Sequence, residues 1–493
     1  MPKGALWNAS GGLFMSKIQM KNKNLLPTLA GIAICCIFCL LPAPEALMRC
    51  AAEAGASGAV AMRVLGVILL AIVWWIGGVF PHWITTVTML LLWVVLGRIP
   101  FGKAFASYTS TTVWLIIGAF CLAAAVTKTG LFNRITLGMI RIFSPTFSGQ
   151  LLALLLVGTL CAPLIPSAAA KAVLGATLAQ KTADAMLYPA GSRQRCGLFM
   201  AAFIGFCITT PAFMSGSVFT YSLLGALTPE SRAAVSWGSW LAAMLPWLLV
   251  ILVGAYIFIR LTAAPAKGAA GVTREYAREE FAKLGPMSGP ERKAMLLLTA
   301  AVSLWVLQDV VGVDAAVTAM GAAVLCFAWG LLEGKEISTA VPWALILHIG
   351  GVINLGSILP AVGLDSWIQE LVLPLFRHVS TPAAAIAATA LLVLLVRTVM
   401  VSQNAVVVML TALLAPLLAV SGVGEWAVGL VILATGSCWL LPFQNTVFIS
   451  AMACTEDTLT HGQTVKYAVF YELSSLAAFL LSIPYWRLLG LIT

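Results

Sequence analysis

The sequence predicts an all-α polytopic membrane protein with about eleven transmembrane helices and two re-entrant hairpins, arranged as two inverted repeats. Three observations lead to this fold class. The 493 residues are 61% hydrophobic and only 9% charged, with a mean hydropathy of +1.00, whereas soluble proteins carry about 25% charged residues. The apolar residues gather in segments long enough to cross a bilayer. Two of these segments are broken by polar residues near their middle.

The unbroken part of the prediction is a series of eleven apolar segments, whose ends are uncertain by a few residues. The N-terminus shows no small-residue cleavage site, so we expect the first segment to be retained as a helix. The segments lie at residues 25–41, 61–80, 82–97, 111–127, 197–225, 236–262, 296–311, 315–332, 341–361, 425–450 and 467–489.

Two further apolar segments, 150–180 and 383–420, carry the polar breaks. Pro166-Ser167 interrupts the first segment, and Ser402-Gln403-Asn404 interrupts the second. Unwound backbone at membrane depth is tolerated only where it is buried in protein or lines a cavity. We therefore predict that both segments are re-entrant hairpins with functional tips.

The basic residues support this arrangement. With the N-terminus placed in the cytoplasm, most of the 28 Lys and Arg residues fall in cytoplasmic loops, as the positive-inside rule requires. The net charge of +10 therefore reflects membrane topology rather than nucleic-acid binding. The first hairpin then enters from the cytoplasmic side and the second from the outer side, and the C-terminus lies outside. Lys171 and Arg397 remain within the hairpins.

A hydrophilic segment divides the chain into two similar halves. It covers residues 263–293 and is predicted to be a cytoplasmic linker. Residues 1–60 form the N-terminus and a first peripheral helix, 61–262 the first repeat, and 294–493 the second. Each half has five spans and one hairpin, and an odd number of spans gives the halves opposite orientations. Inverted repeats with broken helices are typical of secondary transporters.

Each half also has a proline-containing polar interruption after its hairpin: TTPAFMSGS at 209–217 and LPFQNT at 441–446. Together with the two tips, these interruptions predict one site near the midplane of the membrane. Its side chains are hydrogen-bond donors without acidic partners, and helix N-termini add partial positive charge, so an anion is the expected ligand. The candidate residues are Ser167, Lys171, Ser215, Gly216, Ser217, Ser402, Gln403, Asn404, Gln444, Asn445 and Thr446.

Simpler interpretations exist for individual residues. Small and hydroxyl residues in membrane helices often serve only close packing. Lys171 could extend to the interface, although a lysine at membrane depth costs roughly 2.5–3.5 kcal/mol on insertion scales and usually marks a transport pathway. Arg397 is compatible with a structural or a functional role, and His348 is best interpreted as a packed residue. No paired carboxylates, metal-ligand cluster or nucleophile–base motif predicts an enzyme.

Several motifs, in their order and spacing, resemble the divalent anion:sodium symporter family of the ion transporter superfamily. The resemblance runs from about residue 24 to the C-terminus, and it rests on TVWLIIGAF (112–120), TKTGLFNR (127–134), LHIGGVI (347–353) and SIPYWRLLG (482–490). In this family both hairpin tips read Ser-Asn-Thr, and residues near them hold sodium ions. Here the tips read Ser167-Ala168-Ala169 and Ser402-Gln403-Asn404, so both depart from the family motif.

The first tip is similar to that of the family's antiporter branch, which reads Pro-Ser-Asn-Thr-Ala-Arg. In this chain the motif is Pro166-Ser167-Ala168-Ala169-Ala170-Lys171, so Lys171 stands at the basic position. Ala168 replaces the asparagine and offers no side-chain oxygen to sodium. We therefore predict that Lys171 substitutes for a bound sodium ion.

The resemblance implies a homodimer with an elevator-type mechanism that carries small organic anions, either di- or tricarboxylates. The first hypothesis is exchange of these anions without sodium. Sodium-coupled symport is the alternative, with a possible sodium ion near Ser402 and Asn404, and an anion channel or membrane receptor on the same fold is the third. No other cofactor is expected, and a bacterial inner membrane is the default location.

Overall fold

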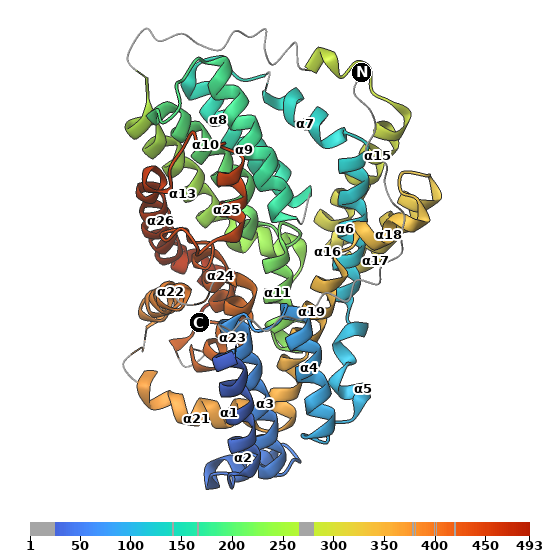
Figure 1. The fold of residues 1–493 in the computed structure, drawn as a ribbon, viewed down its shortest axis with the longest axis vertical. Helices are drawn as coiled ribbons and strands as arrows, with labels where there is room; N and C mark the ends of the chain where they lie inside the picture. Colours follow the sequence, from blue (N-terminus) through green and yellow to red (C-terminus); the bar gives the residue numbers. More distant parts are fainter. Residues whose placement is uncertain are drawn as a thin grey trace.

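The chain is described from a computed structural model (Figure 1). The structure describes residues 25–493 apart from 141, 165–166, 266–280, 377–378, 380, 399, 401 and 419–420. Pro166 of the first predicted break, residues 1–24 and residues 266–280 of the predicted linker 263–293 lie outside the described residues. Within the described part, all regular elements are helical, which confirms the predicted all-α fold class.

A first set of helices, here called the frame group, comes from both halves of the chain. Within it α1 packs on α3, α6 on α17, and α4 on α19; its blue members lie at the bottom of Figure 1. The frame group consists of α1 (Leu25–Leu40), α2 (Glu45–Glu53), α3 (Gly58–Gly77), α4 (His82–Val95), α5 (Phe101–Ala104), α6 (Thr111–Lys128), α15 (Gly289–Val306), α16 (Gln308–Val311), α17 (Ala315–Ala328), α18 (Ile337–Ala340), α19 (Trp343–Ile353) and α20 (Leu355–Ala361).

A second set, the hairpin group, contains both predicted hairpins and the broken helices. In this group, helices from the first half of the chain pack on helices from the second half: α9 on α25, α11 on α23, and α13 on α26. The hairpin group consists of α8 (Phe147–Cys161), α9 (Ala168–Ala185), α10 (Arg193–Phe203), α11 (Val218–Ala226), α12 (Pro229–Ala233), α13 (Trp237–Ala263), α22 (Pro382–Arg397), α23 (Gln403–Leu418), α24 (Glu425–Thr435), α25 (Thr446–Ala453) and α26 (His461–Leu488).

One short helix in each half joins the two groups. In the first half α7 (Leu131–Ile140) leads from α6 to α8, and in the second half α21 (Leu364–Phe376) leads from α20 to α22. The two halves thus repeat the same order: frame helices, a connecting helix, a hairpin and a broken helix. The opposite orientation of the repeats stays a prediction.

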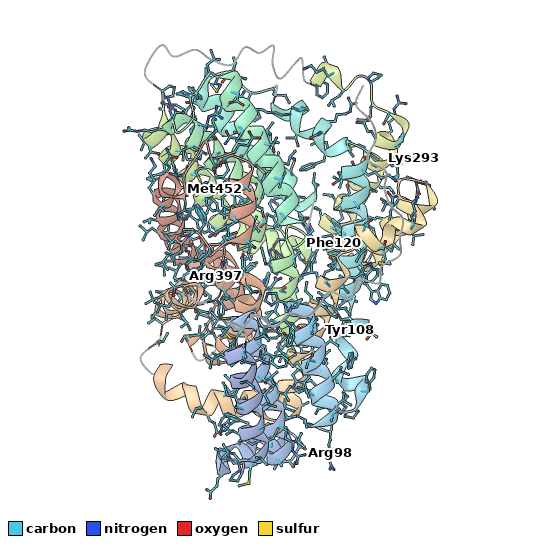
Figure 2. The ribbon with its side chains drawn as sticks, in the orientation of Figure 1. Arg98, Tyr108, Phe120, Lys293, Arg397 and Met452 are labelled. Carbon is cyan, nitrogen blue, oxygen red and sulfur yellow. The ribbon has the colours of Figure 1, made fainter. Side chains whose placement is uncertain are left out.

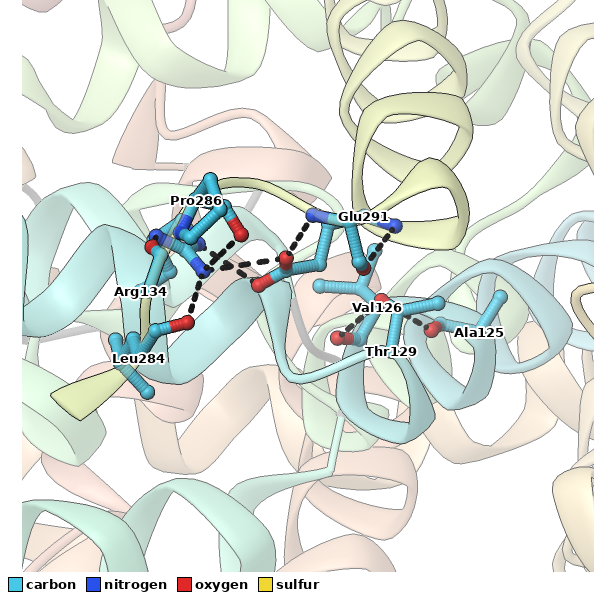
Figure 3. Close-up of polar contacts among 9 residues, drawn as sticks. Ala125, Val126, Thr129, Arg134, Leu284, Pro286 and Glu291 are labelled. Carbon is cyan, nitrogen blue, oxygen red and sulfur yellow. Dashed lines mark hydrogen bonds and ion pairs between the residues drawn. The ribbon is translucent and has the colours of Figure 1, made fainter.

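Arg134 fixes the beginning of the connecting helix α7 (Figure 3). Its guanidinium donates to the Glu291 carboxylate at 2.8 Å and to the carbonyl oxygens of Gly285 at 2.8 Å and Leu284 at 3.0 Å. Glu291 lies in the polar first turn of α15, before the apolar part of that helix. The Arg134 guanidinium and the Ser288 amide hold the pKa of Glu291 below its usual range. The hydrogen bonds of Arg134 therefore connect α7 to the first turn of α15 and to the residues that precede it.

The apolar segments predicted from the sequence coincide with described helices, but their number as spans is not settled. Seven helices in the described part are long and apolar enough to cross a membrane, or eight if the bent pair α1 and α2 forms one span. Helices α4, α17, α22, α23 and α24 are apolar but shorter. The count of eleven spans therefore stays a prediction.

Local chemistry explains why the helices break where they do. After α10 the chain passes through one π turn and a 3-10 turn before α11 begins. Pro211 lacks the amide hydrogen that would continue the helix. A Cβ atom on Gly216 would lie 2.3 Å from the carbonyl oxygen of Thr210, so only glycine fits this turn. The Ser217 hydroxyl then accepts the amide of Thr220 and caps α11.

Candidate functional site

Lys171 joins the first hairpin to the first broken helix. It lies in the first turn of α9 and its side chain is fully buried. Its Nζ donates to the carbonyl oxygens of Ala162 at 3.0 Å and Gly216 at 2.5 Å. No described carboxylate forms an ion pair with it. The side chain therefore does not extend to the surface, and the interfacial reading of Lys171 is wrong.

The serines beside Gly216 hold the same junction together. The Ser215 hydroxyl donates to the carbonyl oxygen of Pro163 at 3.0 Å and accepts the Trp237 indole N–H at 3.2 Å. Ser217 is fully buried at the start of α11. Both predicted site residues thus shape the backbone around the Lys171 ammonium, with their hydroxyls already engaged by protein groups.

Arg397, which is labelled in Figure 2, makes an equivalent connection in the second half. It is the last residue of α22 and is fully buried. Its guanidinium donates to the carbonyl oxygen of Met400, in its own hairpin, at 2.8 Å and to the carbonyl oxygen of Gln444, in the second broken helix. Each half therefore contains one buried cation that links its hairpin to its unwound segment.

The side-chain amides of Gln444 and Asn445 stabilise the unwound segment of the second broken helix. The Gln444 side-chain oxygen accepts the amide of Leu441 at 2.8 Å. Asn445 caps α25 by accepting the amides of Val447 and Phe448, and it donates to the carbonyl oxygen of Ser437 at 2.8 Å. These two predicted site residues therefore support the loop that carries Thr446.

The tip of the second hairpin presents three polar residues at the start of α23. The Ser402 hydroxyl accepts the amide of Ala405 and caps the helix. Gln403 donates to the Ser437 hydroxyl at 2.9 Å, and Asn404 accepts the hydroxyl of Ser222 at 3.0 Å. In these bonds Ser402 and Asn404 act as acceptors, so the Ser402 hydroxyl and the Asn404 amide nitrogen are donors that this tip can offer to a ligand.

The two tips line separate cavities, each between the frame group and the hairpin group. The second cavity, of about 480 Å³, brings together Ser402, Gln403, Asn404 and Thr446. Facing them are Trp75, Ile76, Gly77, Gly78 and His82 of the frame group. The first cavity, of about 460 Å³, contains Ser167 and is bordered by residues that include Phe120, Thr127, Lys128, Glu336 and Thr339. The membership of all eleven candidates in one site stays a prediction.

The family described as the sodium:sulfate symporter transmembrane region matches residues 22–492, nearly the whole chain. The chain belongs to this family. The resemblance to divalent anion:sodium symporters is thereby confirmed, and so is the prediction that the chain is not an enzyme, since the family consists of transporters.

Individual relatives agree with this assignment. The inner membrane protein YbhI of Escherichia coli is 26% identical over 71% of this chain and 74% of its own length. Dicarboxylate transporter 1 of Arabidopsis thaliana chloroplasts is 26% identical over 73% of this chain, which spans 64% of that protein. The L-tartrate/succinate antiporter of Escherichia coli is 25% identical over 54% of this chain and 56% of its own length.

Two solved structures share the fold. The Neisseria gonorrhoeae efflux pump MtrF superposes with a TM-score of 0.53 at 12% identity, over 80% of this chain and 84% of its own. The Alcanivorax borkumensis transporter YdaH superposes with a TM-score of 0.51, also at 12% identity, over 79% and 88% of the two chains. At this identity the likeness concerns the fold alone.

Trp75 and His82 face the second tip across the second cavity. The sequence did not predict either of them as a site residue. The His82 ring lies 5.4 Å from that of His348, and its Nδ1 has no hydrogen-bond partner among the described residues. His348 is buried and shares a 2.8 Å hydrogen bond with the Thr86 hydroxyl, in line with its reading as a packed residue. The available signal was the position of His82, a polar residue after Pro81 at the start of an apolar segment.

A sodium ion would find only neutral oxygen ligands at the second tip. The described residues contain no group of three or more His, Cys, Asp or Glu side chains that could hold a metal. Ser402 and Asn404 carry a hydroxyl and an amide oxygen, and both already accept hydrogen bonds within the protein. Hard cations prefer such oxygens, and a sodium ion near these two residues stays a prediction.

Proposed function

We propose that this chain is a secondary transporter that exchanges small organic anions, di- or tricarboxylates, with Lys171 in place of a bound sodium ion. The contacts of Lys171 carry the proposal. Two carbonyl oxygens converge on its ammonium, at 3.0 and 2.5 Å, at the junction of the hairpin and the unwound segment. Carbonyl oxygens that converge in this way are ligands for a cation, and here the cation is covalently attached.

The second cavity supports an anionic substrate. Its described lining contains no acidic side chain, and it exposes the tip residues together with the N-terminus of α23. A helix N-terminus and amide or hydroxyl donors suit a carboxylate. The names of two relatives, a dicarboxylate transporter and an L-tartrate/succinate antiporter, point to the same substrate class.

The eleven candidate residues then divide between two roles. Those that line a cavity are proposed to contact the anion: Ser167, Ser402, Gln403, Asn404 and Thr446. The others are proposed to fix the charge and the backbone around it: Lys171, Ser215, Gly216, Ser217, Gln444 and Asn445.

The proposed mechanism is of the elevator type, in which the hairpin group moves past the frame group. The single connecting helices α7 and α21 and the cavities between the groups are compatible with such a motion. The proposal includes two inverted repeats (61–262 and 294–493), the N-terminus in the cytoplasm and the C-terminus outside, and a homodimer. The similarity to an inner membrane protein supports a bacterial inner membrane.

Counterflow in proteoliposomes tests the proposal. Vesicles are loaded with unlabelled succinate, malate, tartrate or citrate, and labelled succinate is added outside, with and without sodium. We expect sodium-independent exchange that falls at least about tenfold in Lys171→Ala, because the charge that attracts the anion is lost. Lys335→Ala is the control, since Lys335 is exposed and pairs with Glu333 at the surface. Unchanged exchange and sodium dependence in Lys171→Ala would overturn the proposal.

Sodium-coupled symport is the second candidate, because Ser402 and Asn404 place oxygens at the second cavity. It predicts uptake that requires sodium outside and no anion inside. A channel or a receptor predicts no saturable counterflow. The same vesicles therefore separate all three functions.

A further inference from the structure

His82 is a polar residue of the frame group that lines the second cavity, and the proposed function gives it no role. It is the first residue of α4. The hairpin-group residues Ser402, Asn404 and Thr446 face it across the cavity. The described lining contains no acidic side chain that could pair with the imidazole. The second cavity therefore has polar side chains on both of its walls.

Two hydrogen bonds hold the backbone of His82 in place. Its carbonyl oxygen accepts the Thr86 hydroxyl at 2.9 Å and the Trp75 indole N–H at 3.4 Å. A hydroxyl has a single proton, so the Thr86 oxygen is the acceptor for Nδ1 of His348, which lies 2.8 Å away. His348 belongs to α19, which packs beside α4 (Figure 1). Helices α3 and α19 therefore fix the position from which the His82 ring extends.

The ring of His82, in contrast, has an unused nitrogen. Its Nδ1 has no hydrogen-bond partner among the described residues. A neutral histidine carries its proton on either ring nitrogen, and the hydrogen bond made by one nitrogen normally decides which of them holds it. Since the Nδ1 of His82 makes no such bond, the other nitrogen can hold the proton and donate it to a ligand in the cavity. The neighbouring His348 ring has its Nδ1 engaged by Thr86.

The size and the polarity of the second cavity suit a dicarboxylate that extends from one wall to the other. Its volume of about 480 Å³ falls within the range of about 300–1,000 Å³ found for small-molecule sites. A helix N-terminus lies on each wall, because α4 begins at His82 and α23 begins at Gln403. Pro81, which precedes α4, provides no side-chain cap for the amides of that first turn. Since helix N-termini favour carboxylates, each wall suits one carboxylate.

We infer that the anion bridges the two groups of helices, with one carboxylate at the second hairpin tip and the other accepting a hydrogen bond from the ring of His82. The tip belongs to the hairpin group and His82 to the frame group, so the contact exists in the conformation described here and breaks when the groups move. An anion with a single carboxylate binds at the tip and leaves His82 unused. The inference rests on the proposed function and adds a second carboxylate subsite on the frame group.

Succinate and butyrate test the inference, because they have the same number of carbon atoms but succinate has the additional carboxylate. Their dissociation constants are measured by calorimetry on the purified protein at about pH 8, well above the pKa of about 4 of free carboxyl groups. We expect the wild-type protein to prefer succinate. His82→Leu should weaken succinate binding about tenfold, because a hydrogen bond to a charged group is lost, and should leave butyrate binding little changed. A structural effect on the cavity would instead weaken the binding of both anions.

His82→Gln is the conservative variant, since its side-chain amide can donate a hydrogen bond from the same position. It should retain more of the preference for succinate than His82→Leu. Thr88→Ala is the control for a substitution in α4, because Thr88 lies on the same helix and outside the lining of the second cavity. It should keep the wild-type dissociation constants. Equal affinity of the wild-type protein for the two anions, or an unchanged preference in His82→Leu, would overturn the inference.

Counterflow in vesicles separates failure of this inference from failure of the proposed function. Succinate exchange together with an unchanged preference in His82→Leu overturns the inference and leaves anion exchange standing. A preference that is lost in His82→Leu, when the wild-type protein shows no exchange, supports the subsite at His82 and contradicts the proposed exchange.

Discussion

At the scale of single residues, Lys171 and Arg397 show how a membrane protein can hold a buried cation against main-chain carbonyl oxygens. Lys171 and Arg397 donate to main-chain carbonyl oxygens that the unwound segments leave free. Those oxygens would otherwise be unsatisfied at membrane depth, which costs several kcal/mol per group. The cation and the unwound backbone therefore stabilise each other. Removing either one leaves the other without these hydrogen bonds.

Asn404 gives the sharpest single-residue prediction for the second tip. Asn404→Ala removes an amide from the second cavity, and the Ser222 hydroxyl keeps the carbonyl oxygen of Val218 as an acceptor. We expect the apparent KM for succinate to rise about tenfold, since a hydrogen bond to a charged ligand contributes roughly 1.5–3 kcal/mol. Counterflow at varied succinate concentration measures the change.

The control for this variant is Asn133→Ala, which removes an exposed asparagine from α7. A thermal unfolding midpoint measured for both variants separates loss of binding from loss of folding. An unchanged KM in a stable Asn404→Ala protein would remove Asn404 from the anion site.

The sequence predicted several of the polar residues near the hairpin tips. It did not predict the hydrogen-bond partners of these residues. Lys171 and the Ser402-Gln403-Asn404 run stand out because polar residues are rare in apolar segments. The partners of Lys171 are carbonyl oxygens, which every residue carries, so no side-chain pattern marks them. His82 was missed for a related reason: a single histidine beside a proline gives no periodic signal.

At the scale of secondary-structure elements, the broken helices depend on a few residues that prevent a continuous helix. Gly216 is the strictest of these, because its neighbours leave no room for a side chain. Its carbonyl oxygen is also an acceptor for Lys171. The shape of the turn and the position of the buried charge are therefore coupled.

Gly216→Ala should disrupt this turn. The added Cβ would lie 2.3 Å from the Thr210 carbonyl oxygen and 3.0 Å from that of Phe213, so the backbone must shift and the Lys171 contact must change. We expect exchange to fall at least about tenfold and the unfolding midpoint to drop by several degrees. Gly321→Ala, within α17, is the control, because nothing lies within 4 Å of its added Cβ and alanine favours helix. Equal behaviour of the two variants would contradict the role of Gly216.

Hydropathy located the long elements because burial in lipid requires continuous apolar segments. The helix pairs α8–α9 and α22–α23 lie where the two hairpins were predicted, and the first pair extends a few residues beyond 150–180; their re-entrant course stays a prediction. The connecting helices α7 and α21 were not predicted, since they are short and carry polar residues such as Asn133, Arg134 and Glu370. Those helices join the two groups, so the division of the chain into groups became visible only in the structure.

At the scale of the whole molecule, the contact between α11 and α19 reports on movement between the groups. Gly225 of α11 belongs to the hairpin group and Ile353 of α19 to the frame group. A Cβ atom added at Gly225 would lie 3.3 Å from the Cβ atom of Ile353, close to the 3.5–4.5 Å found in disulfides (about 3.8 Å on average). A disulfide at this position would join the two groups without involving either cavity.

The double variant Gly225→Cys/Ile353→Cys should therefore stop exchange under oxidation and regain it on reduction. If the hairpin group moves as a body past the frame group, one covalent link between them prevents the cycle, whereas small local gating at the tips would continue. Counterflow before and after dithiothreitol measures this, with each single variant as a control for the effect of the substitution itself. Among the native cysteines only Cys36 is classed as exposed in the described part, so few competing disulfides are expected. Full exchange in the cross-linked protein would exclude the elevator motion and favour a mechanism confined to the hairpin tips.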